Sequence, residues 1–215
     1  MAGIILQQPR YAGARPCVHA TLCVVVLAAG GSRRLGRPKQ FVRIGADSLL
    51  RRAARVALAL RPAAVVVVTG AHAVRAAAEL RGLPVTVVTH RMWRAGQAGS
   101  LRAGIRCAPR AAGAVLVFAV DQWRLTAADL ERLLRARRRG RPAAALHDGA
   151  PGVPTLWPRA FWPRLRALQG DRGARELLRR ADVVTVPLPH AAADLDTPAA
   201  LVRLQRTWLR GASSL

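Results

Sequence analysis

The residues best suited to chemistry lie in a glycine-rich stretch near the N-terminus, LAAGGSRRLGRPKQF, residues 27–41. Three of its glycines let the main chain turn sharply and approach a ligand closely. A hydroxyl, a guanidinium and an ammonium group follow in the same loop, which predicts a cradle for a triphosphate. A plain strand-to-helix turn with solvated basic residues is the alternative, and the glycine spacing matches neither GxxxxGKS nor GxGxxG. The cradle residues are Gly30, Gly31, Ser32, Arg34, Gly36 and Lys39.

Lys39 is the only lysine in the chain, whose other 34 basic residues are all arginine. Lysine carries a compact point charge on a long stem, whereas arginine is a rigid planar fork. Because every other basic residue of the chain is arginine, the single lysine indicates a position that needs the shape of a lysine side chain. Lys39 is therefore a candidate for contacting phosphates.

Carboxylates are scarce, with eight Asp and three Glu in 215 residues. Asp121 directly follows the apolar run AVLVFAV, and Asp194 and Asp196 lie in the segment DLDTP. Mg²⁺ in phosphate-transfer sites is held by one or two carboxylates together with phosphate oxygens. Asp121 and Asp196 are thus the candidate metal ligands, and the competing interpretation is that they only cap the turn and helix that follow. No nucleophilic Ser/His/Asp or Cys/His set is evident.

The elements that must position these residues alternate between strand-length apolar runs and longer stretches of helical period, which favours a parallel sheet covered by helices. In such a sheet the carboxyl ends of the strands meet at one edge, where ligands bind. Strands are predicted at 22–27, 64–69, 85–88, 114–120 and 183–188, with weaker candidates at 143–146 and 155–157, and helices at 48–60, 71–80, 99–107, 126–139, 158–168, 173–180 and from 198.

The net charge of +24 would ordinarily indicate nucleic acid or an anionic membrane. The arginines are dispersed along the whole chain, however, which favours solvated helix faces over a dedicated nucleic-acid surface. Three cysteines without metal-ligand or CxxC spacing indicate a reducing, cytoplasmic setting. Residues 20–29 resemble a short signal-peptide core, but they are interpreted as a buried first strand. The predicted organisation is a flexible extension over 1–19 and a single domain over 20–210, with no membrane span.

Four motifs in order resemble those of the MobA-like NTP transferase family, which includes the molybdenum cofactor cytidylyltransferases and guanylyltransferases. LAAGGSRRLGRPKQ is similar to the family signature LAAGxSxRxGxxK. RMWRAGQAGSLRAGI (91–105) resembles its W-x-x-G-x-x-x-S-L-x-x-G segment, QGDRGARELL (169–178) its GDxGAR segment, and DLDTPAAL its D-I-D-T-P segment. The likeness extends over about residues 22–205.

The resemblance implies a Rossmann-like three-layer α/β/α fold with a mostly parallel sheet, of the nucleotide-diphospho-sugar transferase type. It also implies Mg²⁺-dependent transfer of a nucleoside monophosphate with release of pyrophosphate. By the same resemblance, backbone contacts hold the base and ribose, Arg34, Lys39 and Asp121 are catalytic, Asp121 and Asp196 bind the metal, and a separate segment faces the acceptor. The backbone-contact residues are Leu27, Ala28, Ala29 and Gly30; Ser100 also contacts the nucleotide; Gly170, Asp171, Gly173 and Arg175 lie on the acceptor side.

The wording GQAGSL and GDRGAR is closer to the cytidylyltransferase branch, so CTP is the expected donor and a molybdopterin-type cofactor the expected acceptor. A molybdoenzyme or its maturation chaperone is then a possible partner. Two departures stand out: Trp123 replaces the proline that usually follows the Asp-Gln pair, and Thr155 and Trp157 replace Val and Phe in PGxPVLF. The alternatives are a guanylyltransferase, a sugar-phosphate or methylerythritol-phosphate nucleotidyltransferase, a basic nucleic-acid-binding module, and an inactive nucleotide binder.

Overall fold

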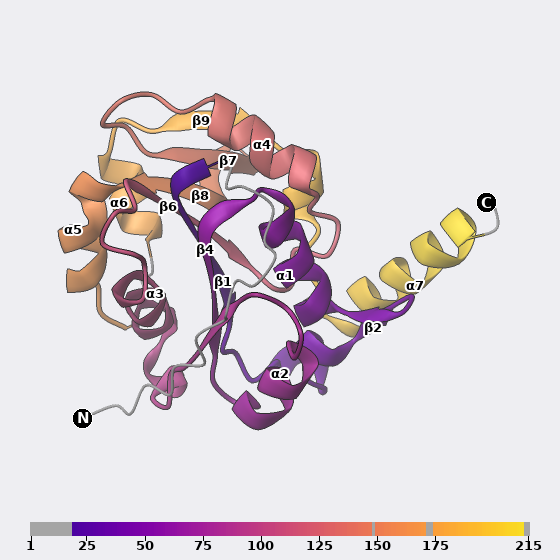
Figure 1. Cartoon of the computed structure of the whole chain (residues 1–215). Coiled ribbons are helices and arrows are strands. Elements are labelled where there is room, and N and C mark those ends of the chain that lie inside the picture. The colour runs from indigo at the N-terminus through magenta and orange to yellow at the C-terminus, as the bar shows by residue number, and fades with distance from the viewer. Residues whose placement is uncertain (1–18, 148, 171–173, 213–215) are drawn as a thin grey trace.

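A computed structural model describes residues 19–147, 149–170 and 174–212, with side chains as far as 207. The predicted extension over 1–19 therefore lies outside the described residues, except for His19, which begins the first strand. Seven strands form one sheet in the order β5-β4-β1-β6-β8-β7-β9 (Figure 1). Only β8 runs antiparallel to its neighbours, so the sheet is mostly parallel as expected.

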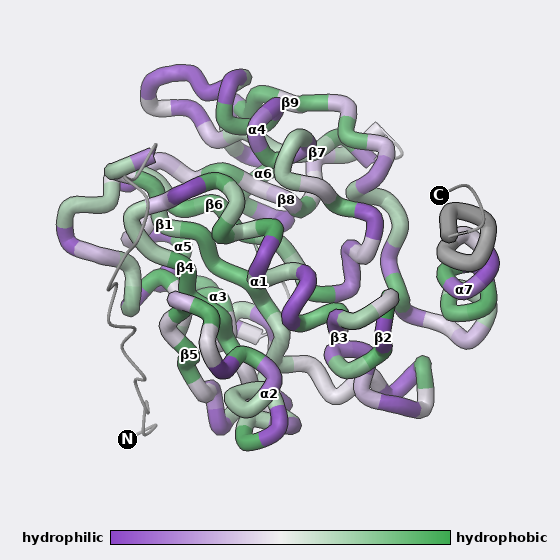
Figure 2. Tube along the Cα trace, turned by 45° about the vertical axis from the view of Figure 1, so that its right-hand side comes forward, coloured by the Kyte–Doolittle hydropathy of each residue, from purple (hydrophilic) through white to green (hydrophobic). Residues whose placement is uncertain are grey.

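The strands of the sheet follow the apolar runs of the sequence, and the central ones are buried on both faces. Figure 2 shows β1, β4 and β6 as hydrophobic segments through the interior. The strands are β1 (His19–Ala28), β4 (Pro62–Thr69), β5 (Thr86–Thr89), β6 (Ala114–Ala119), β7 (Ala143–His147), β8 (Ala150–Pro158) and β9 (Val184–Pro187), and a separate two-stranded hairpin comprises β2 (Arg43–Ile44) and β3 (Asp47–Ser48).

Helices cover both faces of the sheet, which gives the expected three layers (Figure 1). Alternate residues of β1 enter two separate cores: Val24 and Val26 face α1, α2, α4 and the start of α7, while Val25 and Leu27 face α3, α5 and α6. The helices are α1 (Leu49–Ala59), α2 (Ala73–Glu79), α3 (Gln97–Arg106), α4 (Ala127–Arg135), α5 (Trp162–Ala167), α6 (Arg175–Arg180) and α7 (Pro198–Ala212).

Local capping chemistry begins the helices where the sequence predicts. The Ser48 hydroxyl accepts a hydrogen bond from the Arg51 amide at the start of α1. Thr126 and Asp129 form a reciprocal capping box that begins α4. Thr197 accepts from the Ala200 amide before Pro198 opens α7. These caps satisfy amide groups that the first helical turn leaves without partners.

Three predicted boundaries were wrong. The helix predicted over 126–139 ends at Arg135, because the arginine-rich run that follows turns back on itself through a bridge between Arg138 and Arg141. The helix predicted over 158–168 is a 3-10 turn followed by the short α5, since β8 continues to Pro158. The strand predicted at 155–157 belongs to the nine-residue β8. By contrast, Pro187 does lie on an edge strand, as predicted.

A glycine brings α3 close to the sheet. A Cβ atom added at Gly104 would lie 2.5 Å from a methyl group of Val25, closer than real contacts allow. The absence of a side chain there lets α3 pack tightly against β1 and β4. Ser100, one turn earlier on α3, is thereby held beside the carboxyl end of β1, where it lines the pocket described below.

Candidate active site

A pocket of about 310 Å³ opens at the carboxyl edge of the parallel strands. It is bounded by segments that follow β1, β5 and β6 and by the start of α3. Seven of the predicted site residues line it: Leu27, Ala28, Ala29, Gly30, Lys39, Ser100 and Asp121. Its other lining residues are Arg33, Gln40, Trp93, Arg94, Gly96, Gln97, Ala119 and Val120.

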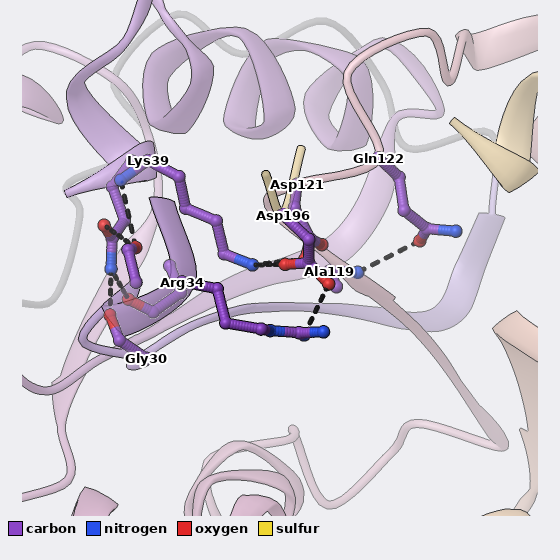
Figure 3. A network of polar contacts seen from close by, with 10 residues as sticks. Gly30, Arg34, Lys39, Ala119, Asp121, Gln122 and Asp196 are labelled. Atoms are coloured by element: carbon purple, nitrogen blue, oxygen red, sulfur yellow. Dashed lines mark hydrogen bonds and ion pairs between the residues drawn. The ribbon is translucent and has the colours of Figure 1, made fainter. Parts of the chain in front are cut away.

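Lys39 is clamped between the two carboxylates that the sequence predicts to be metal ligands (Figure 3). Its Nζ donates to Asp121 Oδ2 at 2.5 Å and to Asp196 Oδ1 at 2.8 Å. The second oxygen of Asp196 accepts from Arg34 Nη2 at 2.7 Å. Four residues separated by up to 162 positions therefore meet at one point, and the solitary lysine lies at its centre.

The charges in this cluster shift one another's proton affinities. Burial alone would lower the pKa of Lys39, but Asp121 and Asp196 outweigh it and raise the pKa. Burial would raise the pKa of Asp196, whereas Lys39 and Arg34 bring it below its usual value. Asp194 differs, because burial and then the carboxylates of Asp121 and Asp196 raise its pKa to about 7. Lys39 and Asp196 are thus held in their charged forms beside a third acid.

Gln40, which the sequence analysis did not single out, holds the glycine loop in shape. It is buried, and its Nε2 donates to the carbonyls of Ala28 at 3.1 Å and Gly30 at 2.5 Å. Ser32 acts from the other side, since its Oγ accepts from the Lys39 amide at 3.0 Å. Burial of a glutamine beside an arginine-rich loop leaves no periodic signal in the sequence, so only the structure shows its role.

Ser32 and Gly36 both adopt left-handed backbone conformations, with φ of 55° and 72°, at the two ends of a short 3-10 turn, Arg33–Leu35. This turn directs Arg33 to the pocket and Arg34 to Asp196. Gly36 suits its position because a side chain disfavours positive φ. Arg34, Gly31, Ser32 and Gly36 therefore belong to the loop without lining the pocket itself.

Trp93 forms a wall of the pocket and is fitted between two glycines. A Cβ atom at Gly31 would lie 2.8 Å from the indole of Trp93. One at Gly70 would lie 2.6 Å from the Ala29 carbonyl and 2.8 Å from the Trp93 Cβ. The segment after β5 is therefore packed directly on the glycine loop after β1 and on the end of β4. Larger residues at either glycine would displace the wall.

Gln122 fixes the corner that carries Asp121. Its Oε1 accepts from the Ala119 amide at 3.2 Å, and its Nε2 donates to the carbonyls of Val153 and Ala191 at 2.9 and 2.8 Å. The Leu195 amide donates to the Asp121 carbonyl at 3.0 Å, which brings the 194–196 segment against the same corner. Backbone pairing thus places Asp196 beside Asp121 across 75 positions of sequence.

The predicted acceptor-side residues are less closely gathered. Gly170 has a positive φ of 62°, and its carbonyl accepts from the Ala98 amide at the start of α3. Arg175 begins α6 and interacts electrostatically with Asp194. Asp171 and Gly173 lie outside the described residues. The described ends of the segment therefore contact the start of α3 and the region of Asp194, next to the pocket, and none of its described residues lines the pocket.

The departures from the family pattern lie away from the pocket. Trp123 packs partly buried against the core on the α1 side, and its carbonyl accepts from Arg52 Nε. Thr155 and Trp157 form a buried pair in which the indole Nε1 donates to the threonine hydroxyl at 2.8 Å. The two substitutions in PGVPTLW thus satisfy one another within the core, and neither residue lines the pocket.

The acidic pair is suited to a cation. Two carboxylates already hold the Lys39 ammonium, and Asp121 Oδ1 is buried without a hydrogen-bond partner among the residues that the structure describes. Within the described part of the chain, no group of three or more His, Cys, Asp or Glu side chains is placed to hold a metal by itself. Phosphate oxygens from a bound nucleotide would have to complete the coordination of a divalent ion, as they commonly do for Mg²⁺.

Comparisons with known proteins identify the family of the chain. The MobA-like NTP transferase domain matches residues 24–185. Nicotine blue oxidoreductase of Paenarthrobacter nicotinovorans is 31% identical over 202 residues, 88% of this chain and 97% of the relative. The probable molybdenum cofactor guanylyltransferase of Opitutus terrae is 33% identical over 179 residues, 79% of this chain and 86% of the relative.

A solved structure has a similar fold over most of the chain. The Mycobacterium tuberculosis Rv0371c homologue from Mycobacterium sp. strain JC1 has a TM-score of 0.77 and 26% identity, and covers 90% of this chain and 99% of its own. Together, the mostly parallel sheet, the pocket at its carboxyl edge and the matched domain define a nucleotidyltransferase-type α/β protein. The chain belongs to the MobA-like NTP transferase family. No helix among the described residues is long and apolar enough to cross a membrane.

Proposed function

We propose that this protein transfers a nucleoside monophosphate from an NTP to a molybdopterin-type acceptor, with Mg²⁺ as the cofactor and CTP as the preferred donor. The observation that carries the proposal is the convergence of Lys39, Asp121 and Asp196 at the rim of a pocket lined by the LAAG backbone. The relative named as a probable molybdenum cofactor guanylyltransferase supports the acceptor class. Residues 20–210 would act as one catalytic domain.

In this reaction an acceptor phosphate oxygen attacks the α-phosphorus of the NTP, and the bond to the β-phosphate oxygen breaks to release pyrophosphate. The main chain of residues 27–30 and Ser100 would hold the base and ribose. When the triphosphate enters, Lys39 exchanges a carboxylate contact for phosphate oxygens, because its long stem lets the ammonium turn without moving the backbone. Arg34 would add a second positive charge from the rim, and such preorganised charges stabilise the transition state.

Asp121 and Asp196 would hold the metal ion once Lys39 has given up one of its two carboxylate contacts. A divalent ion at this position neutralises charge on the phosphates as the leaving group departs. The buried, unpaired Oδ1 of Asp121 supports this role, since a buried carboxylate oxygen without a donor is costly unless a cation contacts it. The chain itself would orient both carboxylates through the backbone pairing of Asp121 with Leu195.

The donor base can be tested directly. Purified protein is supplied with CTP, GTP, ATP or UTP, a molybdopterin-type acceptor and either Mg²⁺ or EDTA, and pyrophosphate release is measured. We expect release with CTP and acceptor that EDTA abolishes. Release with GTP and acceptor, and with none of the other three nucleotides, would assign the guanylyl reaction instead. Release only with a sugar phosphate or methylerythritol phosphate would overturn the proposed acceptor.

A second candidate function comes from the relative named nicotine blue oxidoreductase, because its match covers nearly its whole length. A reaction of that class would transfer two electrons between a redox partner and a substrate bound in the Trp93-lined pocket. It would not need two carboxylates and a metal ion. NADPH oxidation in the presence of a quinonoid dye, unaffected by Asp196→Asn and by EDTA, would favour this function. Pyrophosphate release lost in the same variant would favour nucleotidyl transfer.

A further inference from the structure

A second pocket, of about 430 Å³, lies behind the segment that carries Lys39. Residues on either side of Lys39, among them Arg37 and Phe41, contribute to it. Arg43 of β2, Arg75 of α2 and Leu201 of α7 complete its walls. In Figure 1, β2 and the start of α7 lie together at the side of the molecule, with α2 below them. The pocket is thus assembled from three segments that are distant in sequence, residues 37–43, α2 and α7.

Two of the three arginines are already oriented. The Arg75 guanidinium lies over the ring of Phe41, 4.0 Å from its centroid. Phe41 is itself held by a T-shaped contact with His72, with ring centroids 5.9 Å apart. Arg43 Nη1 donates to the Ala46 carbonyl at 2.6 Å. Because stacking and hydrogen bonding restrict these side chains beforehand, less conformational entropy would be lost when they bind an anion.

The arginines of this pocket form no ion pair within the described residues, although Arg43 and Arg75 also border a neighbouring concavity that contains Asp47 and Glu79. None of the residues that line it is Asp or Glu, and none of its three arginines takes part in an ion pair in the part of the chain that the structure describes. The nearby Asp47 is engaged by Arg51 at 3.6 Å and Arg55 at 3.3 Å. No carboxylate therefore lines this concavity itself, and the charges of Arg37, Arg43 and Arg75 are not paired within it.

We propose that this pocket is a second anion site, which binds a small molecule carrying one or more phosphoryl groups. Guanidinium forks match the oxygen geometry of phosphates and can engage them in bidentate fashion. The concave shape, closed on one side by the buried Leu201 of α7, suits a compact anion better than a nucleic-acid backbone that lies across a surface. The proposal does not depend on the nucleotidyl transfer, because none of the three arginines lines the catalytic pocket.

Site-resolved labelling of arginine tests this directly. The full-length protein is treated with phenylglyoxal, with and without inorganic pyrophosphate, and the rate of modification at each arginine is read by mass spectrometry. Pyrophosphate should slow labelling of Arg37, Arg43 and Arg75 at least tenfold and leave the exposed Arg132 and Arg139 unchanged. Acetate at the same ionic strength should protect none of them. Equal rates with and without pyrophosphate at the three pocket arginines would overturn the proposal.

A double variant, Arg43→Gln with Arg75→Gln, removes two charges and keeps a polar, flexible side chain at each position. It should abolish protection at Arg37, whereas the matched pair Arg132→Gln and Arg139→Gln should retain it. Loss of protection in both variants would show only a general charge effect and would also overturn the site. Should the first variant fail to fold, the labelling of the parent protein, with and without pyrophosphate, still tests the proposed site. Pyrophosphate release by the first variant should match that of the control pair, which keeps this result separate from the proposed function.

Discussion

The two halves of the sheet contribute to the site in different ways. The parallel half, β5, β4, β1 and β6, ends at one edge, so the segments after three of these strands line the same pocket. The mixed half, β8, β7 and β9, contributes through connections that return to this edge. Gln122 donates to Val153 in β8, and the segment after β9 brings Asp196 to Lys39. The parallel half thus supplies most of the residues that line the pocket, and the mixed half helps to position them.

This difference predicts that changes in the two halves will have different consequences. Polar residues at the ends of parallel strands face a pocket, so replacing them should reduce turnover with little loss of stability. Gln122 and Thr126, which lie in the connection from β6 to the mixed half, take part in hydrogen-bond networks, so replacing them should lower the free energy of unfolding. Four substitutions test this division, from the largest expected effect to the smallest.

Asp121→Asn should have the largest effect. The change keeps the shape but removes the charge that holds Lys39, and with it the proposed metal ligand. We expect kcat to fall by about 10³-fold, the upper end of the effect of removing one group that stabilises a transition state. Steady-state pyrophosphate release measures it, and Asp182→Asn, in an exposed pair with Arg141, is the control. Full activity in Asp121→Asn would count against the metal assignment.

Lys39→Arg should preserve the charge and the fold but lower kcat by about 10²-fold, because a planar fork cannot replace a point charge placed among carboxylates and phosphates. The melting temperature should stay within a few degrees of the parent protein. Turnover and thermal unfolding are measured on the same preparation. Unchanged kinetics would show that Lys39 has no role in the mechanism. The presence of a single lysine would then have no functional reason.

Gln122→Leu tests the connection between the halves. The variant would leave the Val153 and Ala191 carbonyls and the Ala119 amide without their present partners. We expect the free energy of unfolding to fall by about 3 kcal/mol, since buried polar groups left unpaired are costly. Chemical denaturation measures it, with the exposed Gln205→Leu as control. A loss no larger than that of the control would show that Gln122 does not join the two halves.

Thr126→Ala should have the smallest effect, about 1 kcal/mol of stability at neutral pH, because it removes the cap of α4. Burial would raise the pKa of Asp129, but hydrogen bonds from Thr126 and His190 outweigh it and lower the pKa. The charged carboxylate therefore stabilises the fold above its unfolded pKa of about 3.9, and this contribution is lost as the pH falls through the lower folded pKa. The difference between variant and parent should shrink in acid; a difference that grows there would contradict the cap's role.

Much of the fold could be predicted from local patterns. Continuous apolar runs such as residues 22–27 and 114–120 mark strands buried on both faces, and Ser48 and Thr126 mark helix starts. The end of α4 at Arg135 could not be predicted, because arginine is a good helix former and the turn bridged by Arg138 and Arg141 leaves no stop signal in the run before it. Only three residues of the nine-residue β8 could be predicted as a strand, because its glycine and prolines obscure the strand pattern.

The candidate site was predicted in the same uneven way. Lys39 and Asp121 stand out by residue type and by their position after strands, and they do meet in the structure. Gln40 and Trp93 were not placed in the site, because their roles depend on contacts with Gly30 and Gly31 that no spacing along the chain reveals. The arginine pocket around Arg75 is of the same kind, since its walls come from three separate segments.

The sequence by itself determined the parallel sheet, the glycine loop and the residues with chemistry at the ends of its strands. These follow from periodicity, capping and residue type, which act over a few positions. Only the tertiary structure decided that Lys39 would be held by Asp121 and Asp196 together, and that Arg34 would turn to Asp196 instead of the pocket. The physical reason is that burial and ion pairing depend on which distant segments the backbone pairing of Asp121 and Leu195 brings together.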